Sequence, residues 1–277
     1  MADLAGKVAI VTGGSLGIGS AAAISLANSG ANVTIMDINE SSGEEVVNTI
    51  NSSGGSGHLI LGDASSSKDC QTTVLETVKL FGGLDILFNN VGIQPPESYT
   101  NVEDTSEEMW DQILSVNLKS RFLMAKYSIP EMRKRGGGVI SSTASVQGQQ
   151  SANLVPAYAA TKGGDLSLTR QMAIDYGPEN IRVLSICPGA IDTPLWRTSV
   201  ESKNMDIEDA VLSSASSTPL GRVGKPEDLG EVISFLASDA ARYMTGTFIK
   251  VDGGLICLLY TSPSPRDATL SRMPSSA

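Results

Sequence analysis

The sequence has few of the residues that build metal centres or disulfide frameworks. Its 277 residues include three cysteines and a single histidine, His58. The cysteines are Cys70, Cys187 and Cys257, and they are too scattered for a zinc site or a disulfide framework, which need close or paired ligands. We therefore expect no metal cofactor and a reducing compartment.

Positive charge and long apolar runs are also scarce. The formal net charge is −10 at pH 7, whereas proteins bind nucleic acid and anionic membranes through basic patches. No apolar run reaches the roughly 20 residues of a membrane-spanning helix, and the first residues lack the apolar core of a secretory signal. The composition predicts a cytoplasmic protein whose partner is a small molecule, with no nucleic acid and no membrane.

Short apolar segments that alternate with helical patterns are abundant. Strands are expected at residues 7–12, 32–36, 58–61, 85–88, 138–143, 181–186 and 246–251. Continuous apolar runs are typical of strands buried on both faces of a parallel sheet. This alternation predicts a single α/β domain over residues 1–256, a doubly wound Rossmann fold with a seven-stranded parallel sheet.

A glycine-rich turn follows the first expected strand and leads into a helix. It reads Thr12-Gly13-Gly14-Ser15-Leu16-Gly17-Ile18-Gly19. Glycines permit a tight turn and let a pyrophosphate approach the helix N-terminus, where free N–H groups favour an anion. The order of strand, turn and helix favours a dinucleotide site.

Asp37 ends the second expected strand. Dinucleotide-binding folds place an acid there against the hydroxyls of the adenosine ribose. The carboxylate would repel the 2′-phosphate of NADP, and neither Leu16 nor Ile38 supplies a compensating cation. NAD is therefore favoured over NADP. The alternative is that Asp37 only caps the helix expected to start near Ser41.

Tyr158 and Lys162 form a candidate acid/base pair. Residues four apart share a helix face, and an adjacent ammonium would lower the pKa of a tyrosine from its ordinary value of about 10. Ser145, just beyond the fifth expected strand, could hydrogen-bond the substrate oxygen that Tyr158 protonates or deprotonates. Because this spacing is also common on ordinary helices, the accompanying motifs decide its significance.

A long helical segment from Ser106 to about Arg135 carries a broad apolar stripe that Pro130 interrupts. Asn117 lies among apolar neighbours there and should have a specific hydrogen-bond partner. It is either a satisfied interior residue or part of the site.

Two further segments are expected near the site. The Pro188-Gly189 turn could hold backbone groups and the Thr193 hydroxyl against a carboxamide, or could be a plain loop. Residues 195–218 are polar and serine-rich, which indicates a mobile substrate lid.

The motifs occur in an order that resembles the classical short-chain dehydrogenase/reductase (SDR) family over residues 4–254. They are Thr12-Gly13-x-x-x-Gly17-x-Gly19, Asn89-Asn90-Val91-Gly92, Asn117, Ser145, Tyr158-x-x-x-Lys162, Pro188-Gly189 and Val251-Asp252-Gly253-Gly254. The resemblance implies that Tyr158 is the general acid/base and that Lys162 lowers its pKa and contacts the nicotinamide ribose. It also implies that Ser145 positions the substrate oxygen and that Asn117 holds the water of a proton relay.

The same resemblance implies NAD as the cofactor and a usual assembly as a homotetramer built on helices 110–131 and 158–176. The cofactor-binding residues would be Gly13, Ser15, Leu16, Gly17, Ile18, Gly19, Asp37, Ile38, Asp63, Ala64, Asn90, Val91, Gly92, Tyr158, Lys162, Pro188, Gly189, Ile191 and Thr193. Val91 departs from the family pattern, in which alanine is common, and a valine could narrow the cofactor groove slightly.

The expected function is an oxidoreductase that transfers hydride between NAD and a small, neutral secondary alcohol or ketone. Rim segments 94–105, 147–155 and 195–217 carry few charges, which fits such a substrate. The alternatives are an NAD-binding regulator without turnover and a reductase of a 3-oxoacyl-type substrate. The regulator is disfavoured because a binding protein has no need of the complete set Asn117, Ser145, Tyr158 and Lys162.

The composition changes after Gly254. Residues 257–267, Cys-Leu-Leu-Tyr-Thr-Ser-Pro-Ser-Pro-Arg-Asp, back-translate into a nucleotide sequence that resembles a widely used transposase sequencing adapter. Residues 257–277 are therefore expected to be a disordered and artefactual tail in place of the gene's own last residues.

Overall fold

The structure is a computed structural model and describes residues 2–258. Its centre is a parallel sheet of seven strands in the order β3-β2-β1-β4-β5-β6-β7. The strands are β1 (Val8–Thr12), β2 (Asn32–Asp37), β3 (Ser56–Leu61), β4 (Ile86–Asn89), β5 (Gly138–Thr143), β6 (Ile181–Pro188) and β7 (Thr247–Val251). All seven overlap the expected segments, and the predicted fold class is confirmed.

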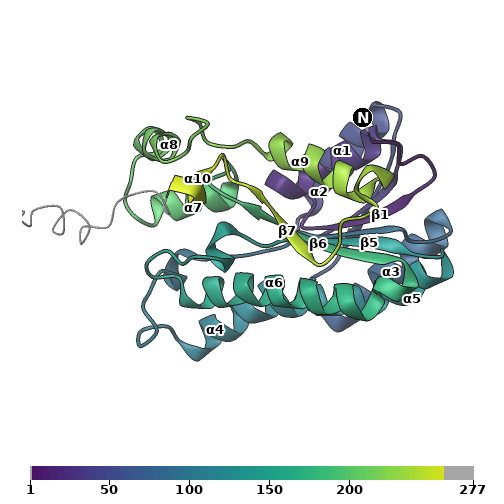
Figure 1. The fold of residues 1–277 in the computed structure, drawn as a ribbon, viewed down its shortest axis with the longest axis horizontal. Coiled ribbons are helices and arrows are strands. Elements are labelled where there is room, and N and C mark those ends of the chain that lie inside the picture. The colour runs from purple at the N-terminus through teal and green to yellow at the C-terminus, as the bar shows by residue number, and fades with distance from the viewer. Residues whose placement is uncertain (1, 259–277) are drawn as a thin grey trace, which may run out of the picture.

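Helices cover both faces of this sheet (Figure 1). On one face lie α1 (Gly17–Asn28), α2 (Glu40–Ser52) and α9 (Pro226–Ala237). On the other lie α3 (Ser67–Phe81), α4 (Glu107–Leu114), α5 (Ser120–Lys134) and α6 (Pro156–Tyr176). Strand β1 pairs with both β2 and β4, so the winding of the chain reverses there. In such folds the crevice beyond the carboxyl ends of the strands at this reversal is where ligands bind.

The remaining helices are short. They are α7 (Pro194–Glu201), α8 (Ile207–Ser216), α10 (Leu255–Leu258), η1 (Pro96–Ser98), η2 (Ser115–Lys119), η3 (Val146–Gly148), η4 (Gly177–Glu179) and η5 (Asp239–Ala241). Helices α7, α8 and α10 lie together at one end of the sheet (Figure 1). The expected lid, 195–218, thus contains two helices, and its mobility stays a prediction.

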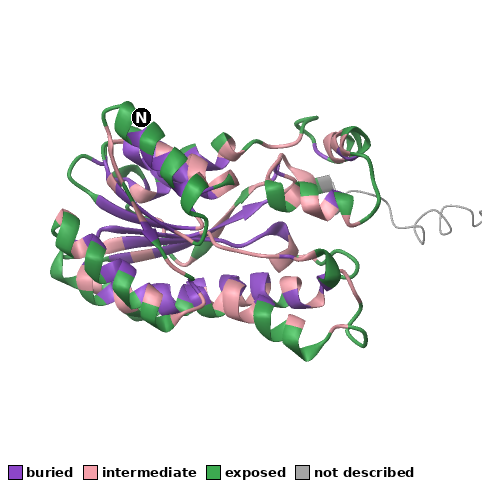
Figure 2. Cartoon of the chain, turned by 180° about the vertical axis from the view of Figure 1, so that it is seen from behind, coloured by how far each residue is buried: buried purple, intermediate pink, exposed green. Residues whose placement is uncertain are grey.

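The apolar runs bury both faces of the strands, as Figure 2 shows for the sheet. Successive side chains of a strand point to opposite faces, so Val11 packs under α1 and α9 while Ile10 packs under α3 and α5. In β4, Phe88 packs on the same face as Val11, and Leu87 packs on the same face as Ile10. The helices bury only their inner sides and expose their outer ones, because each meets the sheet along a single stripe.

The long helical segment differs from the expectation in two ways. Helix α5 continues through Pro130, so the proline does not interrupt it. The break lies earlier, at Ser115–Lys119, where the backbone forms a π-helical turn between α4 and α5. Such turns insert an extra residue into a helix and are frequent at functional sites. Asn117 lies in the middle of this one.

The expected tail is covered only at its start. Helix α10 includes Cys257 and Leu258, and the rest of the segment expected to be disordered lies outside the described residues. Among residues 2–258, no helix is both long and apolar enough to cross a membrane. Within the same residues, no three His, Cys, Asp or Glu side chains are grouped as a metal site would require.

Candidate active site

The glycine turn forms a cradle at the carboxyl end of β1. Gly13 and Gly17 have positive φ angles of 62° and 53°, a region that side chains other than glycine rarely adopt. A Cβ atom on Gly19 would lie 1.9 Å from the Gly13 carbonyl oxygen, so only glycine fits there. Helix α1 begins after Leu16 with no side-chain cap, which leaves its first N–H groups for another acceptor.

Asp37 joins the end of β2 to this turn. One carboxylate oxygen accepts the backbone N–H of Ser15 at 3.0 Å, and the other accepts the N–H of Asn39 at 3.0 Å. The N-cap of α2 is Asn39, whose side chain accepts the N–H of Ser42. The capping alternative for Asp37 is therefore wrong. The neighbouring Ile38 is 78% exposed and apolar, so this residue supplies no cation to the carboxylate.

Three strand ends are tied together by polar side chains. The Thr12 hydroxyl accepts the N–H groups of Asn90 and Val91 at 3.0 and 3.3 Å. The Asn90 amide donates to the Gly13 carbonyl oxygen at 3.0 Å and accepts the Thr143 hydroxyl at 3.0 Å. The ends of β1, β4 and β5 are thus held in one register around Asn90. The Val91 side chain packs against the core under α3 and α5, which limits its effect on the groove.

The loop after β6 closes the other side of the cradle. A Cβ on Gly17 would lie 3.2 Å from the Thr193 methyl carbon, and one on Gly189 would lie 2.9 Å from the Asp252 Cα. The Thr193 hydroxyl caps α7 by accepting the N–H of Trp196 at 3.2 Å. Ile191 is buried and bridges to Gly224. The glycine turn and the loop after β6 therefore approach each other at Gly17 and Thr193.

Asp63 and Ala64 follow β3, next to the end of β2. Ala64 is buried, and one Asp63 oxygen accepts the N–H of Ser65 at 2.8 Å. They lie on the β3 side of the glycine turn because β3 pairs with β2 and β2 with β1. Ile18 packs against the core under α1, so its side chain supports the turn from within.

Tyr158, Lys162 and Ser145 meet beyond the end of β5. The Lys162 Nζ lies 5.2 Å from the centroid of the Tyr158 ring and donates a 2.7 Å hydrogen bond to the Thr143 carbonyl oxygen. Ser145 is close enough to the Tyr158 phenol to lower its pKa, and its hydroxyl accepts the N–H of Gln147 at 3.1 Å. Tyr158 and Lys162 therefore lie on the same face of α6, as their four-residue spacing predicted.

The electrostatics of this group differ from the expectation. Burial raises the pKa of Tyr158 to about 12, although the Ser145 side chain and the Arg121 charge act to lower it. Burial, with a smaller effect of the Arg121 charge, lowers the pKa of Lys162 to about 7. The lowering effect expected from Lys162 is not the dominant one here, because burial acts on the pKa of Tyr158 more strongly than the nearby positive charge does.

Asn117 is fully buried and has a specific partner. Its side chain accepts the Ile93 N–H at 2.8 Å and donates to the Ile93 carbonyl oxygen at 2.8 Å. A Cβ on Gly92 would lie 3.6 Å from Asn117 Oδ1 and 3.8 Å from Lys162 Nζ. Asn117 thus fixes the segment after β4 beside Lys162 through its amide oxygen and its amide nitrogen.

Two residues beneath this group were not anticipated. Arg121 and Asp165 are both completely buried, and Arg121 Nε lies 3.7 Å from Asp165 Oδ2. The available signal was their spacing, since Arg121 follows Asn117 by four residues and Asp165 follows Lys162 by three, which places each on the face of a candidate catalytic residue.

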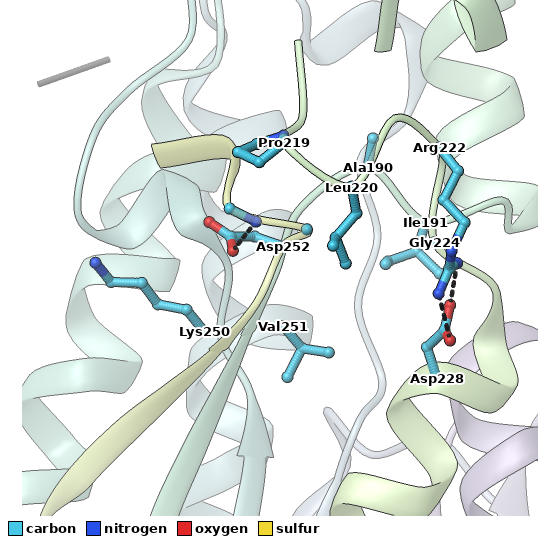
Figure 3. A pocket seen from close by; sticks show the side chains of 12 residues that line it. Ala190, Ile191, Pro219, Leu220, Arg222, Gly224, Asp228, Lys250, Val251 and Asp252 are labelled. Carbon is cyan, nitrogen blue, oxygen red and sulfur yellow. Dashed lines mark hydrogen bonds and ion pairs between the residues drawn. The ribbon is translucent and has the colours of Figure 1, made fainter. Parts of the chain in front are cut away.

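A cleft lies beside the loop after β6 (Figure 3). It has a volume of about 510 Å³ and includes Ile191, Leu220 and Val251 in its lining. On its wall Arg222 pairs with Asp228 through hydrogen bonds of 2.6 and 2.9 Å. This pairing anchors the segment between α8 and α9, which continues the expected lid.

A parallel sheet with a glycine cradle and a Tyr-Lys-Ser group at its carboxyl edge defines a dinucleotide-type oxidoreductase fold. A family model described as Enoyl-(Acyl carrier protein) reductase matches residues 13–256. The chain is 41% identical to an uncharacterized oxidoreductase of Thermotoga maritima, with 90% of this chain and 97% of the relative covered. It is 37% identical to a short chain dehydrogenase/reductase of Aspergillus oryzae, with 91% and 96% covered.

Two further relatives carry names that state a substrate. A cyclohexanol dehydrogenase of an Acinetobacter species is 35% identical, with 89% of this chain and 94% of the relative covered. The crystal structure of levodione reductase superposes with a TM-score of 0.86 at 31% identity and covers 91% of this chain and 98% of that one. The chain belongs to the short-chain dehydrogenase/reductase family, as the motifs predicted, and is an oxidoreductase.

Proposed function

We propose that this protein is an NAD-dependent dehydrogenase that interconverts a neutral secondary alcohol and its ketone. The observation that carries the proposal is the convergence of Tyr158, Lys162 and Ser145 at the carboxyl edge of the sheet, beside Asn117 and the glycine cradle. This convergence supports the proposal, because hydride transfer to or from a carbonyl carbon needs acid/base groups beside the bound dinucleotide.

The proposed roles follow from what each side chain contacts. Tyr158 exchanges a proton with the substrate oxygen, and Ser145 hydrogen-bonds the same oxygen. With a pKa raised to about 12, the phenol is protonated at neutral pH and is ready to donate in the direction of ketone reduction. In alcohol oxidation it must first lose its proton, so that direction is favoured by alkaline pH.

Lys162 and Asn117 organise the floor of the site. The 2.7 Å bond from Lys162 to the Thr143 carbonyl fixes the ammonium between β5 and α6, where it can also reach the ribose next to the nicotinamide. Asn117 holds Ile93 through the oxygen and the nitrogen of its side-chain amide. Because both atoms are engaged with Ile93, we propose that any relay water is held by the backbone of the π-turn.

The residues present fit a nicotinamide dinucleotide. The positions of Gly13, Gly17 and Gly19 have no room for side chains or have positive φ, and the uncapped start of α1 offers N–H groups to a pyrophosphate. When bound, the cofactor would accept or donate the hydride. Asn90, Gly92 and Thr193 would hold its nicotinamide half, and Asp63 and Ala64 its adenine.

The proposed choice of NAD rests on Asp37. Its carboxylate is anchored by the N–H groups of Ser15 and Asn39, so it cannot swing away from a ribose placed over the turn. An added 2′-phosphate would meet this fixed negative charge, and the exposed Ile38 provides no compensation.

The proposed substrate is a cyclic secondary alcohol or ketone. Two relatives are named for such molecules, cyclohexanol and levodione. The candidate rim supports the same class, because Tyr99 contributes an aromatic ring there. The Nζ of Lys203, which follows α7, lies 5.8 Å from the centroid of this ring. The rim segment after η1 therefore lies next to the end of α7.

The test is a panel of substrates with NAD, followed through the absorbance of the reduced cofactor. Cyclohexanol and other cyclic alcohols should be oxidised, and the matching ketones should be reduced. A 3-oxoacyl thioester belongs in the panel, because the matching family model is described by an acyl substrate. Tight NAD binding without turnover of any member would instead favour a regulatory protein.

We also propose a homotetramer. The helices α4, α5 and α6 expose the apolar side chains of Trp110, Phe122 and Ile174, and such a surface is commonly covered by another subunit. Light scattering on the full chain should give four times the monomer mass, and Phe122→Asp should lower it. A wild-type monomer would overturn this assembly.

A further inference from the structure

The Arg121–Asp165 pair lies one helical turn beyond the candidate catalytic residues. Arg121 extends from α5 on the face of Asn117, and Asp165 extends from α6 on the face of Lys162. Both side chains have no exposed surface, and Arg121 Nε is 3.7 Å from Asp165 Oδ2. The structure therefore places a pair of opposite charges in the interior directly behind the site.

The guanidinium joins the ends of two strands. Its Nη1 donates to the Val91 carbonyl oxygen at 3.0 Å, and its Nη2 donates to the Thr143 carbonyl oxygen at 3.2 Å. The Thr143 carbonyl is also the acceptor of Lys162 Nζ. A single side chain thus holds the cofactor motif after β4 and the anchor of Lys162 after β5.

The burial of these two charges is unfavourable for the stability of the fold. Burial lowers the pKa of Arg121 and raises that of Asp165, although their mutual attraction opposes both changes. Arg121 Nε and both Asp165 carboxylate oxygens have no hydrogen-bond partner among the described residues. Apolar pairs of similar volume commonly replace such ion pairs with no loss of stability, so packing by itself does not account for the two charges.

We propose that Arg121 and Asp165 are positioning residues of the dehydrogenase site: Asp165 holds the guanidinium, and the guanidinium fixes the carbonyls that place the cofactor motif and Lys162. The proposal rests on the proposed function. It adds an electrostatic consequence, because the Arg121 charge acts on both Tyr158 and Lys162.

The other groups that act on these two residues are few. Tyr99 from the rim raises the pKa of Tyr158, and the Ser145 side chain lowers it. Asp165 and Cys187 act to raise the pKa of Lys162. Among these groups, Arg121 is the positive charge that acts on both Tyr158 and Lys162. Its removal should therefore raise the pKa of the Tyr158 phenol.

The test compares Arg121→Met, Arg121→Lys, Asp165→Asn and the double variant Arg121→Met/Asp165→Leu with the wild type. Arg133→Met is the matched control, because Arg133 is also on α5 and pairs with Glu179, but on the surface. Each protein is measured for melting temperature, NAD dissociation constant by fluorescence, and kcat and kcat/KM of alcohol oxidation against pH.

We expect Arg121→Met to raise the NAD dissociation constant and to lower kcat by about tenfold each, because the Val91 carbonyl loses its guanidinium donor and the Thr143 carbonyl keeps only Lys162. Its oxidation profile should move to higher pH by about one unit. Arg121→Lys keeps the charge without the planar fork, so it should restore the pH profile but not the NAD affinity. Asp165→Asn should lower kcat through a displaced guanidinium, and Arg133→Met should match the wild type.

The double variant separates positioning from stability. It should melt at or above the wild-type temperature and still show the NAD and kcat losses of Arg121→Met. Wild-type NAD affinity, kcat and pH profile in the folded double variant would overturn the proposal. If the double variant does not fold, unchanged NAD affinity in Arg121→Lys would overturn it instead.

Failure of the proposed function has a different signature. In that case the wild type oxidises no alcohol, whereas the NAD dissociation constants of the variants still report on the Val91 and Thr143 carbonyls. Equal NAD affinity in all folded variants would overturn the positioning role whatever the reaction is.

Discussion

The Asp37 carboxylate accepts the backbone N–H of Ser15 at 3.0 Å. This bond joins the end of β2 to the glycine turn after β1 and fixes a negative charge at the position where the adenosine ribose would lie. The lone pairs of the carboxylate that the N–H groups of Ser15 and Asn39 leave free can accept hydrogen bonds from ribose hydroxyls, as long as the 2′ position carries no phosphate.

Asp37→Ala should therefore narrow the preference for NAD over NADP. The wild type should show a higher kcat/KM with NAD, and the variant should lose NAD affinity while NADP improves, because the repulsion is removed. Initial rates with both cofactors give the ratio. Glu40→Ala is the control, since Glu40 is an exposed acid at the start of α2. A wild-type preference for NADP would contradict the assignment.

Tyr158→Phe should remove turnover and leave NAD binding almost unchanged. The ring keeps its packing while the proton-exchanging oxygen is lost, and general acid/base groups contribute about 10²- to 10⁴-fold to the rate. Parallel measurement of kcat and the NAD dissociation constant checks this. Tyr176→Phe, on the same helix α6, should retain activity. Near-normal turnover of Tyr158→Phe would assign the proton to another group.

Oxidation and reduction should depend on pH in opposite ways. Because the pKa of Tyr158 is raised to about 12, the phenolate fraction grows about tenfold per pH unit below that value. Alcohol oxidation should therefore accelerate steadily from pH 7 to 10, whereas ketone reduction, which uses the protonated phenol, should not gain. The measurement is kcat/KM in both directions in buffers of constant ionic strength. An oxidation rate that is flat over this range would refute the raised pKa.

Gly19→Ala should abolish NAD binding. The new methyl group would lie 1.9 Å from the Gly13 carbonyl oxygen and 2.5 Å from the Asn90 amide nitrogen, so the turn must open and the Asn90 contacts must change. Isothermal titration with NAD measures the loss, and thermal unfolding measures the accompanying destabilisation. Gly177→Ala is the matched control, because a Cβ there meets nothing within 4 Å. Full NAD affinity in Gly19→Ala would show that the cradle is not the pyrophosphate site.

Much of the fold could be predicted because its signals are local. Residues such as Val11 and Ile10 belong to apolar runs whose strand character follows from two buried faces, and the glycine turn identifies the first strand-to-helix connection. The joint order of the motifs then indicated the family, which the relatives confirm. The π-turn at Asn117 left no comparable signal, because apolar spacing does not distinguish it from an ordinary helix.

The sequence by itself determined which residues could meet: the four-residue spacing placed Tyr158 and Lys162 on one face, and the strand ends placed Ser145 and Asn90 at one edge. Only the tertiary structure decided how they behave there. It brought Arg121 and Asp165 together from two helices, and it raised the pKa of Tyr158 where spacing alone suggested a decrease. Local spacing follows from covalent geometry, whereas desolvation depends on every group that packs around the phenol.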